Sequence, residues 1–243
     1  MLRWRGMVTA TEGLPWTTGR RQAAAFHTRS SILMTMDKVF IYWDNSNIFH
    51  EAQRLAEEHN GTPGARYLIR IDFEAMLRLA HADRPVHSAI AAGSVPPEMR
   101  QLWNRLESRG VEVRLYDRGD PYRGEQDVPD RILQVRMLED LADHIDDPGI
   151  AVLLIGDGAG YLEGTGFHST LERMHTRGWR IEILSWAHAT NQRMRRWAQE
   201  NGLFVALDDF YDSVTFREPS RPGHEFAVGR DPAPLDLSTR QMS

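Results

Sequence analysis

An acid and two amides lie together where a strand-like segment meets a helical one. The apolar run Val39–Trp43 continues directly into Asp44, Asn45, Ser46 and Asn47. Ligands of open α/β sheets bind outside the carboxyl ends of the strands. Carboxylate and amide oxygens at such a position suit a hard divalent cation such as Mg²⁺. The spacing therefore predicts a metal site for phosphate chemistry.

More acids stand after strand-like segments or near the start of helical ones. They are Glu125, Asp127, Asp130, Asp157, Asp208 and Asp209. If the strands form one parallel sheet, these carboxylates gather at its carboxyl edge. Crowded carboxylates persist at neutral pH chiefly when a cation neutralises them or when one stays protonated. Mg²⁺ or Mn²⁺ at this edge would activate water and neutralise the charge that develops on a scissile phosphate.

Helix capping is an alternative explanation for single residues of this set. The side-chain oxygens of Asp and Asn accept the free N–H groups of a helix's first turn, so Asp44, Asn47 and Asp127 could be caps alone. Asp157, which stands between two glycines, could likewise belong to a strand-ending turn. Capping does not account for the joint placement of the acids at one edge, and this placement favours a shared site.

Strand-like and helix-like segments alternate from Lys38 onward, as in βαβ units that build a parallel sheet. The expected strands are Val39–Trp43, Val86–Gly93, Val111–Tyr116, Ala151–Ile155, Arg180–Ser185 and Phe204–Leu207. The expected helices are Ile48–Glu58, Asp72–Ala82, Pro97–Ser108, Asp130–Ile145, Phe167–Thr176 and Asn191–Glu200. The alternation predicts the α/β class, with a sheet that positions the acids.

The two ends of the chain and one connection lie outside this pattern. Residues 1–35 carry five arginines against one acid and no apolar period, which predicts a disordered leader. An over-extended start is expected because Met34 and Met36 stand just before the first strand, and an organelle transit peptide is the alternative. Residues 36–216 form the predicted domain, residues 59–70 a surface insertion within it, and residues 217–243 a flexible tail.

Composition narrows the classes of function. The 243 residues contain no cysteine, which excludes disulfides, thiolate zinc sites and cysteine nucleophiles. This absence fits a reducing compartment, and a cytoplasmic location is expected. The net charge is −5. Any contact with nucleic acid must therefore be local, because the chain as a whole is not basic. No apolar stretch approaches the roughly 18 residues of a membrane-spanning helix, so no membrane association is expected.

Several segments carry a family pattern, in order, along residues 38–216. They are Phe40–Asn47, Glu125–Val128 followed by Leu133–Met137, Leu153–Gly158, Trp179–Trp186 and Leu207–Tyr211. This ordered set resembles the NYN domains, which belong to the PIN-like nuclease superfamily. The resemblance implies a Rossmann-like three-layer α/β/α sandwich with a mainly parallel sheet of five to six strands.

The resemblance also implies an activity, that of a Mg²⁺- or Mn²⁺-dependent ribonuclease, a hydrolase that binds RNA. By position, Asp44 is the first metal-binding acid, Asp157 the acid after the fourth strand and Asp208 the last. Asp127 or Asp130 would supply the acid at the start of the fourth helix. The expected catalytic residues are Asp44, Asp130 and Asp157, with Asp127 and Asp208 as additional metal ligands.

Four more residues are expected to contact the substrate. Asn45 and Asn47 are the polar companions of the first acid. Arg193 and Arg196 would contact backbone phosphates, although a solvated helix face is an alternative explanation for both arginines. RNA is the expected partner, and a homo-oligomer is left open.

Two positions depart from the family pattern. Pro129 stands where many members have an acid entering the fourth helix, and Ala159 replaces another acid that many relatives carry. Fewer ligands bind metal more weakly, so the alternative function is a catalytically weakened NYN-fold module that binds RNA or a protein. A phosphatase with Asp44 as nucleophile fits badly, because Ser46 stands where its second acid is needed.

Overall fold

The computed structural model describes residues 37–60, 65–94, 100–116, 128–156, 166–219 and 228–243. Every described residue belongs to the second of the chain's two units, Thr35–Ser243. Within these described ranges, no helix is both long and apolar enough to cross a membrane.

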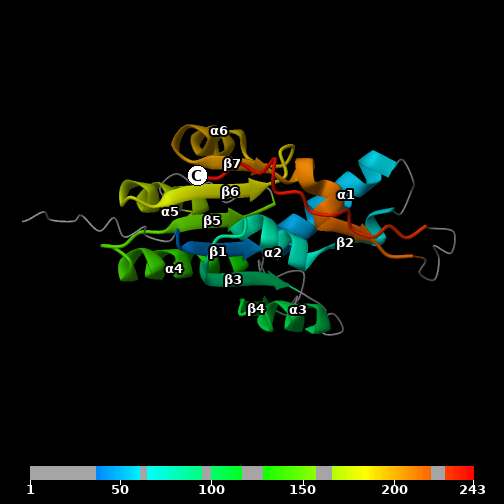
Figure 1. The fold of residues 1–243 in the computed structure, drawn as a ribbon, viewed down its shortest axis with the longest axis horizontal. Coiled ribbons are helices and arrows are strands. Elements are labelled where there is room, and N and C mark those ends of the chain that lie inside the picture. Colours follow the sequence, from blue (N-terminus) through cyan, green and yellow to red (C-terminus); the bar gives the residue numbers. More distant parts are fainter. Residues whose placement is uncertain (1–36, 61–64, 95–99, 117–127, 157–165, 220–227) are drawn as a thin grey trace, which may run out of the picture. The chain divides into compact units, whose positions relative to one another are not determined.

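The second unit is built around a six-stranded sheet in which every neighbouring pair is parallel (Figure 1). Its strands are β1 (Val39–Asp44), β3 (Val86–Ser94), β4 (Glu112–Tyr116), β5 (Ile150–Leu154), β6 (Arg180–Ser185) and β7 (Leu203–Ala206). Their order across the sheet is β4-β3-β1-β5-β6-β7. The predicted strands are confirmed, each with bounds within one residue of the prediction.

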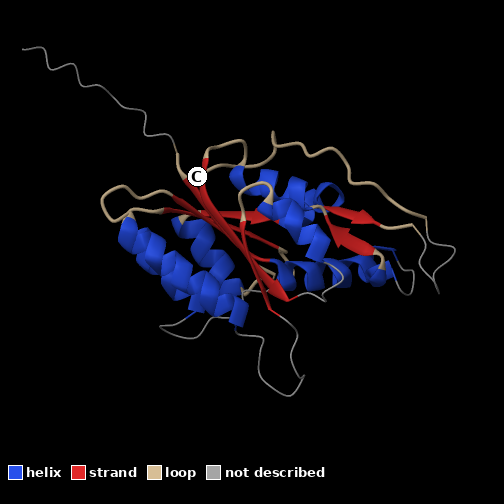
Figure 2. Ribbon diagram, turned by 90° about the horizontal axis from the view of Figure 1, so that it is seen from below, coloured by secondary structure: helices blue, strands red, loops and turns tan. Residues whose placement is uncertain are grey.

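Helices cover both faces of the sheet (Figure 2). The longer ones are α1 (Asn45–Asn60), α2 (Phe73–His81), α3 (Arg100–Glu107), α4 (Val128–Asp143), α5 (Gly166–Thr176) and α6 (Gln192–Asn201). Residues of α1, α2 and α3 share one buried apolar cluster with the sheet, and residues of α4, α5 and α6 share a second. The predicted α/β class and its three-layer sandwich are therefore confirmed.

Strand β1 is buried on both of its faces, which explains its uninterrupted apolar sequence. Val39, Ile41 and Trp43 belong to the first cluster, whereas Phe40 and Tyr42 belong to the second. Continuous apolar runs are typical of central strands in parallel sheets, because helices cover both faces. The central place of β1 puts its carboxyl end in the middle of the sheet edge.

The strand order reverses beside β1. From β1 the chain builds β3 and β4 on one side, then returns to place β5 on the other side before continuing to β6 and β7. Tyr42 accordingly pairs with Ile90 of β3 and with Leu153 of β5. Open α/β sheets bind ligands at such a reversal, outside the carboxyl ends of the strands. The ends of β1 and β5 are therefore where a functional site is expected.

Two short strands form a second sheet that the sequence did not predict. Strand β2 (Ile69–Ile71) pairs antiparallel with β8 (Thr215–Arg217). The remaining short elements are η1 (Ala65–Tyr67), η4 (Leu207–Phe210) and α7 (Tyr211–Val214). Arg70 is buried within β2, where its Nη2 pairs with Glu218 at 2.9 Å. The predicted surface insertion over residues 59–70 is wrong in its last part, because the pairing with β8 buries that segment.

The described part of the predicted flexible tail packs against the domain. Arg240 is only 5% exposed, and its Nη2 donates to Oε2 of Glu182 on β6 (2.6 Å). Leu235 and Leu237 pack against the first apolar cluster. Residues 228–243 thus differ from the expected loose tail, because a buried carboxylate and apolar contacts hold them on the sheet.

Candidate metal and nucleic-acid site

Asp44 ends β1 and caps helix α1. Only 1% of the residue is exposed. The backbone N–H of Asn47 donates to Oδ1 (3.3 Å), and the side-chain Nδ2 of Asn47 donates to Oδ2 (2.8 Å). The capping role considered as an alternative is therefore present. The same contacts fix the orientation of the carboxylate at the sheet edge, so capping and a functional role are compatible.

Asn45, the residue after Asp44, has a buried acceptor without a partner. It is 8% exposed, and its Oδ1 is buried with no hydrogen-bond partner in the described part of the chain. A buried polar atom without a partner costs about 1–3 kcal/mol, so such an atom in a native structure requires an explanation. The carboxylate of Asp44 and the unpartnered amide oxygen of the next residue are ligand types that fit Mg²⁺ or Mn²⁺.

The end of β5 lies against the first turn of α1. A Cβ atom at Gly156 would come within 2.3 Å of the carbonyl carbon and oxygen of Asn47. The carbonyl of Gly156 accepts from Oγ of Ser185 at the end of β6 (2.9 Å), and Oγ1 of Thr190 donates to that hydroxyl (2.7 Å). Gly156, the residue before Asp157 in the sequence, is thus held directly beside Asn47.

Gly156→Ala is expected to lower the free energy of unfolding by about 3 kcal/mol, because the added Cβ meets backbone atoms of Asn47 rather than a movable side chain. Chemical denaturation measures this loss. Gly110→Ala is the control, since Gly110 has a φ of 82° but nothing within 4 Å of its Cβ position. Only backbone strain of about 1 kcal/mol is expected there. Equal losses in the two variants would contradict the close contact between β5 and α1.

A second group of polar side chains lies between α1 and the loop after β6. Nε2 of His188 is 3.0 Å from Oε2 of Glu51, and its Nδ1 is 3.5 Å from Oδ1 of Asp208. Asp208 also accepts from the backbone N–H of Ala187 through Oδ2 (2.6 Å). Because Asp208 lies in η4, directly after β7, this group ties the ends of β6 and β7 to α1.

Glu51 and His188 were missed by reasoning from the sequence, although each had a signal. Glu51 stands four residues after Asn47, which is one helical turn along the same face of α1. His188 stands three residues after β6, at the carboxyl edge where the acids were expected. Neither position alone predicts a contact between them, because the contact joins segments 137 residues apart.

The other predicted site residues lie on several elements. Asp130 is half-buried in the first turn of α4, and Arg193 and Arg196 are exposed on α6. Asp127 and Asp157 lie outside the described residues. Among the residues that are described, no three or more His, Asp or Glu side chains form a group that could hold a metal ion. The site of five acids therefore stays a prediction.

Comparison with known proteins assigns the chain to a family. The family model of the NYN domain matches residues 38–202, more than half of the 243-residue chain. No curated protein matches the chain. The matched range runs from β1 to α6 and so includes both strands at the reversal. NYN domains are PIN-like nuclease domains, which generally use divalent metals, and the match supports a nuclease-like, RNA-related function. The chain belongs to the NYN domain family.

Proposed function

We propose that the protein is a metal-dependent endoribonuclease that hydrolyses RNA phosphodiester bonds at the carboxyl edge of its sheet. One observation carries the proposal: where the strand order reverses, the buried Asp44 is followed directly by Asn45, whose Oδ1 is buried without a partner in the described part of the chain. Membership of the NYN family supports RNA as the substrate.

In this proposal the acids bind the cation. Asp44, Asp130 and Asp157 would bind Mg²⁺ or Mn²⁺, with Asp127 and Asp208 as further ligands. When bound, the cation supplies positive charge to a scissile phosphate and lowers the pKa of an attacking water. The acids keep their charge because the cation neutralises their mutual repulsion.

Other side chains orient the acids and the RNA. Asn47 holds the Asp44 carboxylate through two hydrogen bonds, so this group needs little reorganisation when substrate binds. Asn45 adds its side-chain oxygen to the same donor set. Arg193 and Arg196 would contact RNA phosphates, because a guanidinium can bind a phosphate through two hydrogen bonds.

Removal of metal is expected to stop the reaction. Labelled single-stranded and hairpin RNAs should be cleaved when Mg²⁺ or Mn²⁺ is present and left intact when EDTA is added, as scored on denaturing gels. Absence of cleavage with both metals, across RNAs of varied sequence and structure, would refute the enzyme. RNA binding without cleavage would instead identify the catalytically weakened binding module.

A further inference from the structure

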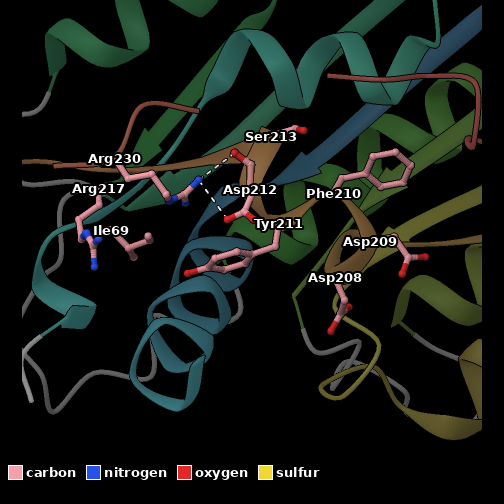
Figure 3. A pocket seen from close by; sticks show the side chains of 9 residues that line it. All are labelled: Ile69, Asp208, Asp209, Phe210, Tyr211, Asp212, Ser213, Arg217 and Arg230. Atoms are coloured by element: carbon pink, nitrogen blue, oxygen red, sulfur yellow. Dashed lines mark hydrogen bonds and ion pairs between the residues drawn. The ribbon is translucent and has the colours of Figure 1, made fainter. Parts of the chain in front are cut away.

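A cavity of about 380 Å³ opens beside Asp208 (Figure 3). Its walls come from β2, η4, α7, β8 and the segment that contains Arg230. In Figure 3 Asp208 and Asp209 lie on one side of the cavity, Arg217 and Arg230 on the other, and Tyr211 between them. The volume is within the range of small-ligand pockets. Two acids line one side of the cavity and two arginines line the other, where Asp212 pairs with Arg230.

The side of the cavity with Asp208 continues into the candidate site. Asp208 contacts His188, and His188 contacts Glu51 on α1. Nε1 of Trp186 also donates to the carbonyl of Ile48 in the first turns of α1 (3.0 Å). The cavity is therefore joined to α1, the helix that Asp44 caps, through side chains that are in direct contact.

Arg230 is occupied by partners within the protein. Its Nη1 donates to the carbonyl of Asp212 (2.9 Å) and lies 3.2 Å from Oδ1 of the same residue, while its Nη2 donates to Oγ1 of Thr215 (2.7 Å). The backbones of Arg230 and Arg217 also exchange two hydrogen bonds. The N–H of Arg217 donates to the carbonyl of Arg230 (2.8 Å), and the N–H of Arg230 donates to the carbonyl of Arg217 (2.9 Å). Arg230 thus positions the backbone that carries Arg217.

Arg217 is different, because its side chain has no ion pair with any described residue. Its Nε is buried without a hydrogen-bond partner in the described part of the chain. A buried guanidinium N–H without an acceptor is costly, and a planar guanidinium is suited to phosphate. Burial raises the pKa of Tyr211 even though the charges of Arg230 and Arg217 lower it, and the guanidinium carbon of Arg230 lies 5.7 Å from the centre of the Tyr211 ring.

We propose that this cavity binds a backbone phosphate of single-stranded RNA next to the cleaved bond, with Arg217 as the residue that contacts it. The identity of the ligand rests on the proposed function. An RNA strand with its scissile phosphate at the metal-binding acids would enter the cavity at Asp208 and place a neighbouring phosphate at Arg217. Ile69 and Tyr211 provide an apolar wall for the ribose or base.

The test is RNA binding by Arg217→Gln, measured by fluorescence anisotropy in EDTA so that no cleavage consumes the RNA. Affinity is expected to fall about tenfold, the effect of losing one hydrogen bond to a charged group. The slope of log affinity against log salt should become shallower by about 0.7, because one phosphate contact with a single strand is lost. Arg177→Gln is the matched control, since Arg177 is exposed and stands before β6, at the other end of the sheet.

Each outcome decides a different claim. Unchanged affinity and slope in Arg217→Gln, with normal binding by the wild type, would overturn the cavity proposal and leave the nuclease intact. No binding of RNA by the wild type would overturn both. If Arg217→Gln weakened the binding of an acidic peptide as much as it weakened the binding of RNA, the cavity would be assigned to a protein partner and the RNA assignment would be overturned. Thermal denaturation of Arg217→Gln establishes that the variant is folded.

Discussion

Asp44→Asn is expected to reduce metal-dependent RNA cleavage by about 100-fold or more. The substitution removes one negative charge from the ligands of the cation, and such a cation stabilises the transition state by several kcal/mol. The substitution keeps the size of the side chain. The asparagine Oδ1 can still accept the backbone N–H of Asn47 that Asp44 accepts now. The backbone hydrogen bond of the helix cap therefore survives, whereas the Asn47 amide must turn its oxygen toward the new Nδ2 to keep the second hydrogen bond. The loss of activity should therefore exceed any loss of stability.

Initial cleavage rates at saturating Mn²⁺, read together with the melting temperature, measure this effect. Asp146→Asn is the matched control, since it is exposed in the turn before β5 at the opposite end of the sheet. It should cleave like the wild type. A fully active Asp44→Asn would remove Asp44 from the metal site and would leave it as a helix cap only.

Glu182→Gln is expected to lower the free energy of unfolding by about 3–5 kcal/mol, because breaking a buried ion pair leaves the opposite charge uncompensated. Glu182 is 0% exposed and accepts from both terminal nitrogens of Arg84 (2.7 and 2.8 Å). Nη2 of Arg240 and the hydroxyl of Ser243 also donate to it, at 2.6 and 2.7 Å. This loss is a large part of the free energy of unfolding of a typical domain, which is about 5–15 kcal/mol.

Urea denaturation of the wild type and Glu182→Gln measures the difference. Glu74→Gln is the control because Glu74 pairs with Arg109 at 2.8 Å on the surface, with 72% of its side chain exposed. Exposed pairs contribute little, so almost no change is expected there. A loss in Glu182→Gln as small as in Glu74→Gln would show that the buried pair does not stabilise the fold.

The same carboxylate predicts a dependence on pH. Burial alone would raise the pKa of Glu182, but hydrogen bonds from Arg84 and the charge of Arg240 lower it from 4.5 to about 2. Since the folded pKa lies below the unfolded one, the contribution to stability is complete above about pH 5 and is lost as pH falls toward 2. Wild-type stability should therefore fall more steeply between these pH values than that of Glu182→Gln.

The main sheet could be predicted from the sequence because its strands are apolar runs with clear ends. The apolar period predicts the start of α1 at Ile48, three residues late, because the helix begins with the polar Asn45 directly after the Asp44 cap. The strands β2 and β8 have three residues each. That length is too short for an alternation to be recognised, and their pairing joins distant parts of the chain.

The candidate site was predictable only where its residues are neighbours in the sequence. Asp44 and Asn45 follow a strand directly, so their place at the sheet edge could be inferred. The contact of His188 with Glu51 depends on segments that only the fold brings together, and so does the buried Nε of Arg217 without a partner in the described residues. The local sequence does not show which side chains already have a hydrogen-bond or ion-pair partner in the folded protein.

The pairing of β1 with β5 joins positions more than 100 residues apart, as Val39 beside Ile150 illustrates. Non-local pairings of this kind form slowly in folding, because the entropy of closing a long loop must be overcome first. Asp44 and Gly156 stand at the ends of these two strands. A nascent or truncated chain would therefore carry the residues of the candidate site without the site itself, and the proposed binding of RNA would require the completed domain.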